Sequence, residues 1–432
     1  MKLSDLIDFN PKRPIEKGAI APFIEMADLP EGERDVSGIG NRIFNGGGSK
    51  FKNGDTLFAR ITPCLENGKT AKVSGLPDNA VGHGSTEFIV MAAKDPGVDE
   101  DFVYYVARHP EFRAYAKGRM EGTSGRQRVS WQAISDYEIP DFSSHERSGI
   151  GSVLSSMDNL IANYRRVNQS LESMARTLFK AWFVDFEPVR AKIEGRWQRG
   201  QSLPGMPAHL YDLFPDRLVE SELGEIPDGW GLGRFSDVVE IIGGGTPKTS
   251  VTEYWGGEIP WFSVVDTPTG SDVFVVQTEK TITQAGLSES SARLIPKGST
   301  IISARGTVGN LAIAGCDMAF NQSCYALRGK NDSGRYFVFL SSQRMVEQLK
   351  AMAHGSVFST ITRQTFEAVP VVLPPGNALH HFERSAAGLL DPILGNVKET
   401  RTLAQLRDTL LPKLISGDLR IPDAERIFGV AE

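Results

Sequence analysis

Cysteine and histidine are scarce in this sequence, and their scarcity excludes several kinds of site. The chain has 3 cysteines and 7 histidines among 432 residues. Because Cys64, Cys316 and Cys324 form no C-x-x-C pair, the sequence predicts neither a zinc site nor a disulfide framework, and we expect buried free thiols. The histidines also lack metal-ligand spacing such as H-E-x-x-H. We therefore expect no bound metal.

Long hydrophobic runs are missing as well. No apolar stretch approaches the roughly 20 residues that a bilayer span needs. The first residues, MKLSDLIDFN, place acids where a signal peptide needs a basic end followed by an apolar block. The sequence therefore predicts a cytoplasmic protein without a membrane association.

Catalytic motifs are equally hard to find. Asn67-Gly68-Lys69-Thr70 ends like a phosphate-binding loop, but Pro63 stands where that pattern needs its first glycine. No serine lies in a G-x-S-x-G elbow, and the glycine triplets do not complete G-x-G-x-x-G. We therefore predict no catalytic residues, which favours a binding protein over an enzyme acting alone.

The charge balance gives mixed indications about nucleic acid. The formal net charge is −6, whereas a protein that binds nucleic acid tightly by itself needs clustered lysines and arginines. Residues 108–128 are nevertheless rich in cations and contain only Glu111 and Glu121 as acids. This stretch is either a solvated helix face followed by a loop or a basic binding surface.

The sequence contains one design twice. Ser4-Asp5 recurs as Ser236-Asp237, and Gly122-Thr123 recurs as Gly355-Ser356. At nearly the same offset, four further residues recur: Asp158, Asn163, Lys180 and Asp185 match Asp391, Asn396, Lys413 and Asp418. Ala59-Arg60 matches Ala304-Arg305 at a somewhat longer offset. A period this long indicates two copies of a domain, each followed by a helix.

Each copy begins with short β-like runs separated by glycine and proline. In the first copy, residues 56–60 and 87–91 are strand-like, a helix is expected over about 100–117, and a closing strand over 136–140. The second copy repeats this pattern from Trp230 to about Pro375. The sequence thus predicts two β-rich domains.

A long helix is predicted after each β-rich domain. Residues 152–183 contain neither proline nor glycine, and their apolar positions follow nearly heptad spacing, with Asn168 as a polar interruption. A single apolar stripe needs a partner helix, which the second copy supplies before Pro412. The predicted seam comprises Leu154, Met157, Ile161, Tyr164, Leu171, Met174, Leu178, Ile393, Val397, Leu403, Leu406 and Leu410. Alternatively, each helix packs on its own domain.

Several segments of this chain resemble type I restriction-modification specificity subunits. The segments Phe179-Lys-Ala-Trp-Phe-Val-Asp-Phe-Glu-Pro188 and Leu406-Arg-Asp-Thr-Leu-Leu-Pro-Lys-Leu-Ile-Ser-Gly-Asp-Leu419 are similar to that family's conserved helical regions. Gly224-Glu-Ile-Pro-Asp-Gly-Trp230, Gly244-Gly-Thr-Pro247 and Ile259-Pro-Trp261 resemble the start of its target recognition domain. The first half lacks the Gly-Thr-Pro loop.

The resemblance implies an α+β fold: two β-rich target recognition domains in a pseudo-twofold arrangement, joined by two long antiparallel coiled-coil spacer helices. We expect recognition domains at 1–142 and 229–380, spacer helices at 143–186 and 381–420, a connector at 187–228 and a tail at 421–432. A helix from Asp158 to Phe183 would be roughly 39 Å long, close to one turn of B-DNA at about 34–36 Å.

The function implied is recognition of a bipartite double-stranded DNA target. Methylation would come from a methyltransferase subunit, expected in two copies, and cleavage from a restriction/translocase subunit. S-adenosylmethionine, ATP and Mg²⁺ would be bound by these partners and no cofactor by this chain. The candidate DNA contacts are Arg60, Lys69, Thr123, Arg126, Arg128, Thr246, Lys248, Arg305, Ser356 and Arg363. The alternative is a scaffold or adaptor with two β-rich binding domains, which the acidic charge favours.

Overall fold

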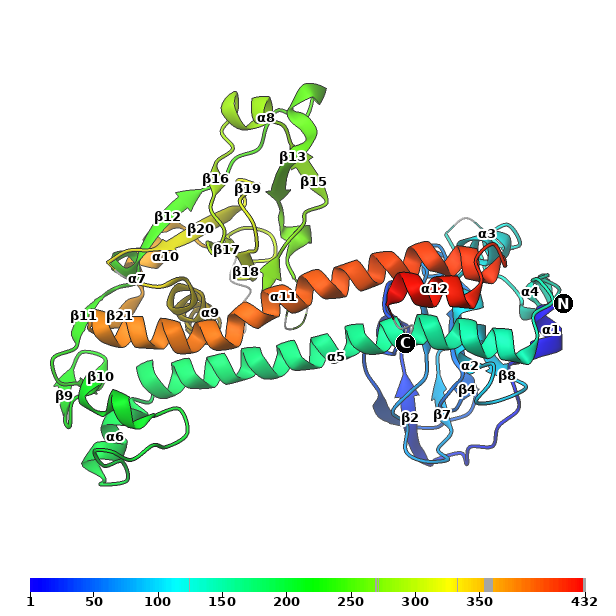
Figure 1. Cartoon of the computed structure of the whole chain (residues 1–432), viewed down its shortest axis with the longest axis horizontal. Coiled ribbons are helices and arrows are strands. Elements are labelled where there is room, and N and C mark those ends of the chain that lie inside the picture. The colour runs from blue at the N-terminus through cyan, green and yellow to red at the C-terminus, as the bar shows by residue number, and fades with distance from the viewer. Residues whose placement is uncertain (124, 269, 271, 332, 353–359, 430–432) are drawn as a thin grey trace. The chain divides into compact units, whose positions relative to one another are not determined.

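The chain folds into two compact units (Figure 1). The computed structural model describes residues 1–123, 125–268, 270, 272–331, 333–352 and 360–429. Unit 1 comprises Met1–Ala162 and Thr400–Glu432, and unit 2 comprises Asn163–Glu399. The long helices α5 (Ser144–Phe183) and α11 (Gly376–Ile415) each contribute residues to both units.

Two four-stranded sheets form the body of unit 1. In the first, of order β1-β8-β5-β6, all neighbours are antiparallel. The second has the order β3-β2-β7-β4, in which β2 and β7 are parallel. The strands are β1 (Ile7–Phe9), β2 (Ile20–Ile24), β3 (Gly40–Ile43), β4 (Ser49–Phe51), β5 (Thr56–Ala59), β6 (Thr70–Lys72), β7 (Gly82–Gly84) and β8 (Phe88–Ala93).

Strand β5 is buried on both faces, which explains its continuous apolar run. Leu57 joins Phe51 of the second sheet in one buried cluster, while its neighbour Phe58 joins Phe102 and Leu154 of the helices in another. Successive side chains of a strand point to opposite faces. One face of the first sheet therefore packs on the second sheet, and its other face packs on helices.

Unit 1 also contains short helices. They are α1 (Leu3–Leu6), α2 (Glu100–Arg108), α3 (Pro110–Lys117), α4 (Trp131–Ser135) and α12 (Ile421–Phe428). The single helix predicted over 100–117 is wrong in one respect, because it breaks at His109, whose backbone is extended (φ −58°, ψ 129°). A residue before proline is disfavoured in the helical region. Residues 136–140 form only an isolated bridge between Glu138 and Lys2 instead of the predicted strand.

Unit 2 repeats the two-sheet topology of unit 1. Its sheets have the orders β12-β20-β17-β18-β14 and β15-β13-β19-β16, and β13 pairs with β19 in parallel as β2 does with β7. The strands are β12 (Val239–Gly243), β13 (Trp255–Phe262), β14 (Phe274–Val275), β15 (Lys280–Ile282), β16 (Leu294–Ile295), β17 (Thr300–Ser303), β18 (Leu311–Ala314), β19 (Met318–Phe320) and β20 (Cys324–Gly329). The predicted duplication is thus confirmed at the level of strand pairing.

The rest of unit 2 surrounds these sheets. Strands β9 (Leu218–Ser221) and β10 (Gly224–Pro227) form a small hairpin. Strand β11 (Gly231–Arg234) pairs with β21 (Pro370–Leu373), which is distant in sequence. The helices are α6 (Glu187–Ile193), α7 (Phe235–Val238), α8 (Gln284–Ser288), α9 (Arg335–Met352) and α10 (Arg363–Ala368). Short 3₁₀ turns complete both units.

The recurring Ser-Asp pairs have a local structural cause. In α1 the Asp5 carboxylate accepts a hydrogen bond from the Lys2 backbone N–H at 2.8 Å, and in α7 Asp237 accepts one from Arg234 at the same distance. An acid at the third helical position satisfies a donor that the helix itself leaves free. Each pair therefore starts a short helix that leads into the first strand of its copy.

Helices α5 and α11 pack together and run antiparallel. In unit 1, Leu154 and Met157 from the first half of α5 share a buried cluster with Leu410 and Leu414 from the end of α11. In unit 2, the later α5 residues share a cluster with the earlier α11 residues Leu390 and Ile393. Pairing the beginning of one helix with the end of the other requires opposite directions, as the sequence predicted.

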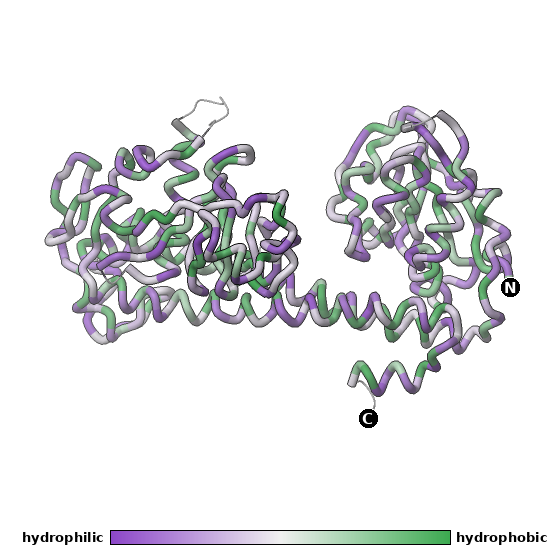
Figure 2. Tube along the Cα trace, turned by 90° about the horizontal axis from the view of Figure 1, so that it is seen from above, coloured by the Kyte–Doolittle hydropathy of each residue, from purple (hydrophilic) through white to green (hydrophobic). Residues whose placement is uncertain are grey.

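No helix in the described part of the chain is long and apolar enough to cross a membrane. Figure 2 shows hydrophilic and hydrophobic residues alternating along the long helices. This alternation is typical of helices that bury one stripe against protein and keep the other sides polar.

Candidate nucleic-acid interface

Arg128, in the loop predicted as a DNA contact, is bound by a side chain of its own unit. The Arg128 guanidinium binds Glu87 with Nε at 2.9 Å from both carboxylate oxygens and Nη2 at 2.7 Å from Oε1. Glu87 raises the pKa of Arg128 through this hydrogen bond and its charge. Arg128 is therefore engaged within unit 1, whereas Arg126 and Thr123 are exposed.

Arg60 lies beside this loop at the end of β5. Its backbone is fixed by Val129, whose N–H donates to the Arg60 carbonyl at 3.0 Å, and the adjacent Ile61 forms a bridge with Arg128. The structure thus brings Arg60 and Arg128 together. Lys69 is further committed, because its amino group donates to the Met26 carbonyl at 3.0 Å. It therefore has fewer donors left for a phosphate than the sequence suggested.

In unit 2, the Gly-Gly-Thr-Pro-Lys loop follows β12 and is tightly packed at its start. A Cβ at Gly244 would lie 2.1 Å from the Asn321 carbonyl oxygen, and one at Gly245 would lie 2.1 Å from that of Ser291. The Gly245 carbonyl accepts from the Trp261 indole at 3.0 Å. Glycine is thus required at both positions because backbone and side chain meet there.

The outer part of this loop is the accessible part. Lys248 is exposed, and Thr246 is half-buried with its hydroxyl on the Gln322 side chain. Since this packing holds the base of the loop, Lys248 is presented on a fixed backbone. A fixed presentation suits contact with a ligand of defined geometry.

The remaining arginines predicted for the second domain are exposed but differ in their contacts. Arg305 follows β17 and forms a backbone bridge with Thr360. Arg363 starts α10 and donates from Nη2 to the Ile241 carbonyl at 3.0 Å. Ser356, the remaining predicted contact, lies outside the described residues.

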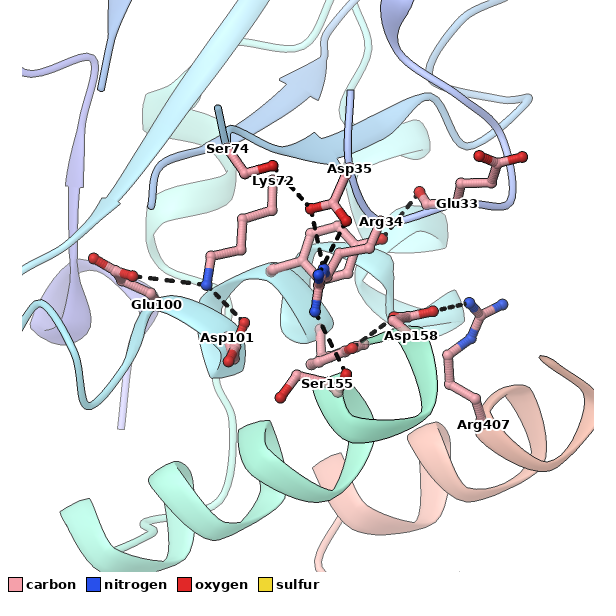
Figure 3. A network of polar contacts seen from close by, with 12 residues as sticks. Glu33, Arg34, Asp35, Lys72, Ser74, Glu100, Asp101, Ser155, Asp158 and Arg407 are labelled. Carbon is pink, nitrogen blue, oxygen red and sulfur yellow. Dashed lines mark hydrogen bonds and ion pairs between the residues drawn. The ribbon is translucent and has the colours of Figure 1, made fainter. Parts of the chain in front are cut away.

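A buried polar network joins the sheets of unit 1 to the long helices (Figure 3). Asp158 on α5 accepts from the Tyr105 hydroxyl at 2.6 Å and forms an ion pair with Arg407 on α11. The side chains of Asp158 and Arg407 are 5% and 4% exposed. Burial raises the pKa of Tyr105, and the Asp158 carboxylate adds to this effect, so the tyrosine keeps its proton as donor.

The same network reaches the sheet side of unit 1. Arg34 pairs with Asp35 at 3.0 Å and donates to the Ser155 carbonyl at 3.5 Å, while Lys72 on β6 binds Asp101 on α2 at 2.7 Å. Arginine is suited to such multiple bonds because its guanidinium carries several donors in a fixed plane. The sheets are thereby tied to the helix on which they pack.

Unit 2 contains a corresponding contact at the repeat position of Asp158. Asp391 on α11 accepts from the Tyr336 hydroxyl and pairs with Arg335 at 2.6 Å. Glu383, which precedes Asp391 on α11, accepts hydrogen bonds from the backbone N–H groups of Tyr336 and Phe337 at 3.1–3.2 Å. Burial raises the pKa of Glu383. The recurring aspartates thus serve to attach a helix of each copy to a long helix.

The predicted seam is buried in part. Leu154, Met157, Ile161, Ile393 and Leu410 are buried; Tyr164, Leu171, Leu178, Val397, Leu403 and Leu406 are half-buried. Met174 is 55% exposed and so lies outside the packed stripe. Asn168 is fully buried: its amide donates to Asp272 at 2.9 Å, and its oxygen accepts from Asn396 at 2.8 Å. The polar interruption therefore has partners within unit 2.

Cysteine, histidine and carboxylate side chains form no group suited to a metal ion within the described residues. All three cysteines are free. Cys324 is buried, and burial raises the pKa of its thiol to about 12. Cys64 and Cys316 are half-buried, which corrects the expectation that all three thiols are buried.

Comparisons of this chain with known proteins agree on one family. Residues 227–381 match the family model described as type I restriction modification DNA specificity domain. The chain is 28% identical over 408 residues to the type I restriction enzyme HindI specificity subunit of Haemophilus influenzae, covering 85% of this chain and 87% of that one. It is 24% identical over 333 residues to the MjaIX specificity subunit of Methanocaldococcus jannaschii, covering 76% and 71%.

A solved structure supports the fold. The type I restriction-modification system S subunit from M. genitalium matches with a TM-score of 0.53 and 15% identity over 96% of this chain and 95% of that one. The likeness extends over both sheet regions and the long helices. Taken with the sequence matches, these findings show that the chain belongs to the specificity subunits of type I restriction-modification systems and is a DNA specificity subunit, the non-catalytic chain of such an enzyme.

Proposed function

We propose that this chain recognises a bipartite duplex DNA target, with one half-site contacted by each copy of the two-sheet domain. The observation that carries the proposal is the repeated topology: two corresponding sheets occur in each unit, with β14 as one extra strand in unit 2, and each unit is attached to a long helix through a tyrosine–aspartate contact. Two copies of one recognition domain in one chain suit a target with two separate parts.

The domain limits of this proposal are those predicted from the sequence. Residues 1–142 and 229–380 form the recognition domains, 143–186 and 381–420 form the helical spacers, 187–228 connect the halves, and 421–432 are the tail. The spacer helices fix the distance between the half-sites. Arg126, Lys248, Arg305 and Arg363 remain candidate DNA contacts because each is exposed.

The chain directs chemistry that its partners perform. A methyltransferase subunit, in two copies to match the two helical regions, supplies methylation with S-adenosylmethionine. A restriction/translocase subunit supplies cleavage and uses ATP and Mg²⁺. The acidic net charge of −6 is compatible with this division of labour, because the partners then provide part of the positive surface that holds DNA.

A domain exchange tests the proposal. Residues 229–375 are replaced by the equivalent segment of a relative with a different target, and the methylated sites of a host carrying the complete system are mapped. The exchange is expected to change one half-site and leave the other unchanged. Exchange of residues 1–142 is the matched control, and it is expected to change the other half-site. A change in both half-sites, or in neither, after either exchange would refute the proposal.

A further inference from the structure

A cleft of about 630 Å³ lies in unit 1 where the two sheets meet. It is lined by residues 10–14 after β1, 48–50 at the start of β4, Arg60 at the end of β5, and Thr86 with Phe88 at the turn into β8. The wall at Gly48 requires glycine, because its φ is +74° and a Cβ would lie 2.4 Å from the Gly84 carbonyl oxygen. The cleft is thus built by a close approach of two strands.

The lining carries four cations and no acid: Lys12, Arg13, Lys50 and Arg60. Of these, Arg13 is neutralised by the buried Asp55. The neighbouring acid, Glu87, is already bound by Arg128. The cleft therefore keeps a surplus of positive charge in a chain whose net charge is −6.

The three remaining cations are free to bind a ligand. Among the described residues, Lys12, Lys50 and Arg60 form no ion pair, and the buried Nε of Arg60 has no hydrogen-bond acceptor. The Lys50 amino group lies 5.0 Å from the centre of the Phe44 ring, a cation–π contact that leaves its N–H donors without an anionic partner in the described part of the chain. A cleft lined by these cations, one of which has an N–H without an acceptor among the described residues, favours a ligand that is rich in oxygen acceptors.

The first recognition domain shares this arrangement with the second. Since β8 is antiparallel to both β1 and β5, these two strands run parallel and end at the same edge of the sheet, where Lys12 and Arg60 follow them. In unit 2, β12 and β17 are related through β20 in the same way, and Lys248 and Arg305 follow them. The two copies thus place a lysine and an arginine at equivalent edges.

We propose that Lys12, Lys50 and Arg60 form a groove that binds consecutive phosphates of one DNA strand, and that Lys248 and Arg305 form its counterpart in the second domain. The ligand follows from the donors: phosphate oxygens only accept hydrogen bonds, and the cleft offers cations without carboxylates. The Asn10 oxygen, an acceptor suited to a base edge, is occupied by the Val90 N–H at 2.9 Å. This inference rests on the proposed function.

The salt dependence of DNA binding tests the groove. The K12A/R60A chain is purified in complex with its methyltransferase subunit and titrated with a target duplex and a scrambled duplex. The loss of two phosphate contacts is expected to flatten the plot of log affinity against log salt by about 1.8, since each contact contributes about 0.9. Between about 50 and 200 mM salt, wild-type affinity then falls about 12-fold more than that of the variant. Adding K50A to this double variant should flatten the salt plot further.

A charge-matched control distinguishes the effect of losing the groove from the effect of losing two positive charges anywhere on the unit. K2A/K94A also removes two cations, but these lie before β1 and after β8, at the opposite edge of the sheet, where Lys94 binds the Ser4 carbonyl. The control should keep the wild-type slope. The groove is overturned if K12A/R60A keeps the wild-type salt slope, or if both double variants lose the same amount of slope. It is also overturned if R60A changes the preferred DNA sequence, because that would indicate base contact. If the wild-type complex does not prefer its target duplex, the proposed function itself fails.

Discussion

The ion pair between Asp158 and Arg407 offers a sharp test of how unit 1 is held together. Arg407 is 3% exposed, and its guanidinium binds both Asp158 and Asp408. Burial disfavours its charged form, yet the two carboxylates raise the pKa of Arg407, so it remains charged. Arg407→Ala therefore leaves the Asp158 carboxylate buried, with the Tyr105 hydroxyl as its described partner.

The magnitude follows from burial. Breaking a buried ion pair by removing one member costs about 3–5 kcal/mol of unfolding free energy. In a unit of this size, 1 kcal/mol changes the melting temperature by about 2–4 °C, so R407A should lower the unit 1 transition by about 6–20 °C. Arg420→Ala is the matched control: its ion pair with Asp423, at 3.0 Å, is in the same unit but 81% exposed at the arginine. Exposed pairs contribute at most about 1 kcal/mol.

Differential scanning calorimetry of the wild type and these two full-length variants measures the shifts. A third variant, D158N in the R407A background, removes the orphaned charge and should regain part of the loss, because the introduced amide oxygen can still accept from the Tyr105 hydroxyl. If R407A melts no earlier than R420A, the buried pair contributes nothing beyond a surface pair. If the double variant is less stable than R407A alone, an uncompensated charge is not the cause.

Other measurements test other contacts. Asn168→Ala removes the partner of Asp272 and Asn396 and should cost about 1–3 kcal/mol in thermal unfolding of unit 2; an unchanged melting temperature would contradict the bonds. Burial lowers the pKa of His109 below 6.5, so its neutral form is favoured in the fold. The contribution of neutral His109 to the free energy of unfolding is fully present above pH 6.5. It is lost as the pH falls from 6.5 through the lowered pKa of His109. The melting temperature of wild type should fall more steeply below about pH 6.5 than that of H109N, and parallel pH profiles would refute this.

Features set by near neighbours in the chain could be predicted from the sequence. The Ser-Asp pairs start helices through a bond three residues away, and the nearly heptad spacing of Leu154, Met157 and Ile161 indicated the buried stripe of α5. Met174 fits the same spacing but is exposed, because the stripe drifts around a straight helix. The break at His109 also has a local signal in the sequence, because Pro110 follows it.

Features set by distant partners could not be predicted. Arg128 and Arg126 look alike in sequence, and their difference arises from Glu87, which is remote in the chain. Lys12, which the proposed groove includes, is not among the contacts predicted from the sequence although it follows β1 as Lys248 follows β12, because the two loops differ in length and composition. The sheet pairing that makes them equivalent joins strands far apart in sequence, and such pairing leaves little trace in any local window.

The composition of unit 1 has a consequence for synthesis on the ribosome. Leu154 and Met157 emerge early, but Leu410 and Leu414, which cover them, are made only after all of unit 2. At about 5–20 residues per second, the early apolar stripe waits many seconds for its partner. A nascent chain interrupted before Thr400 lacks the α11 residues that complete this cluster and leaves part of the stripe uncovered, so premature termination is expected to yield a product prone to aggregation.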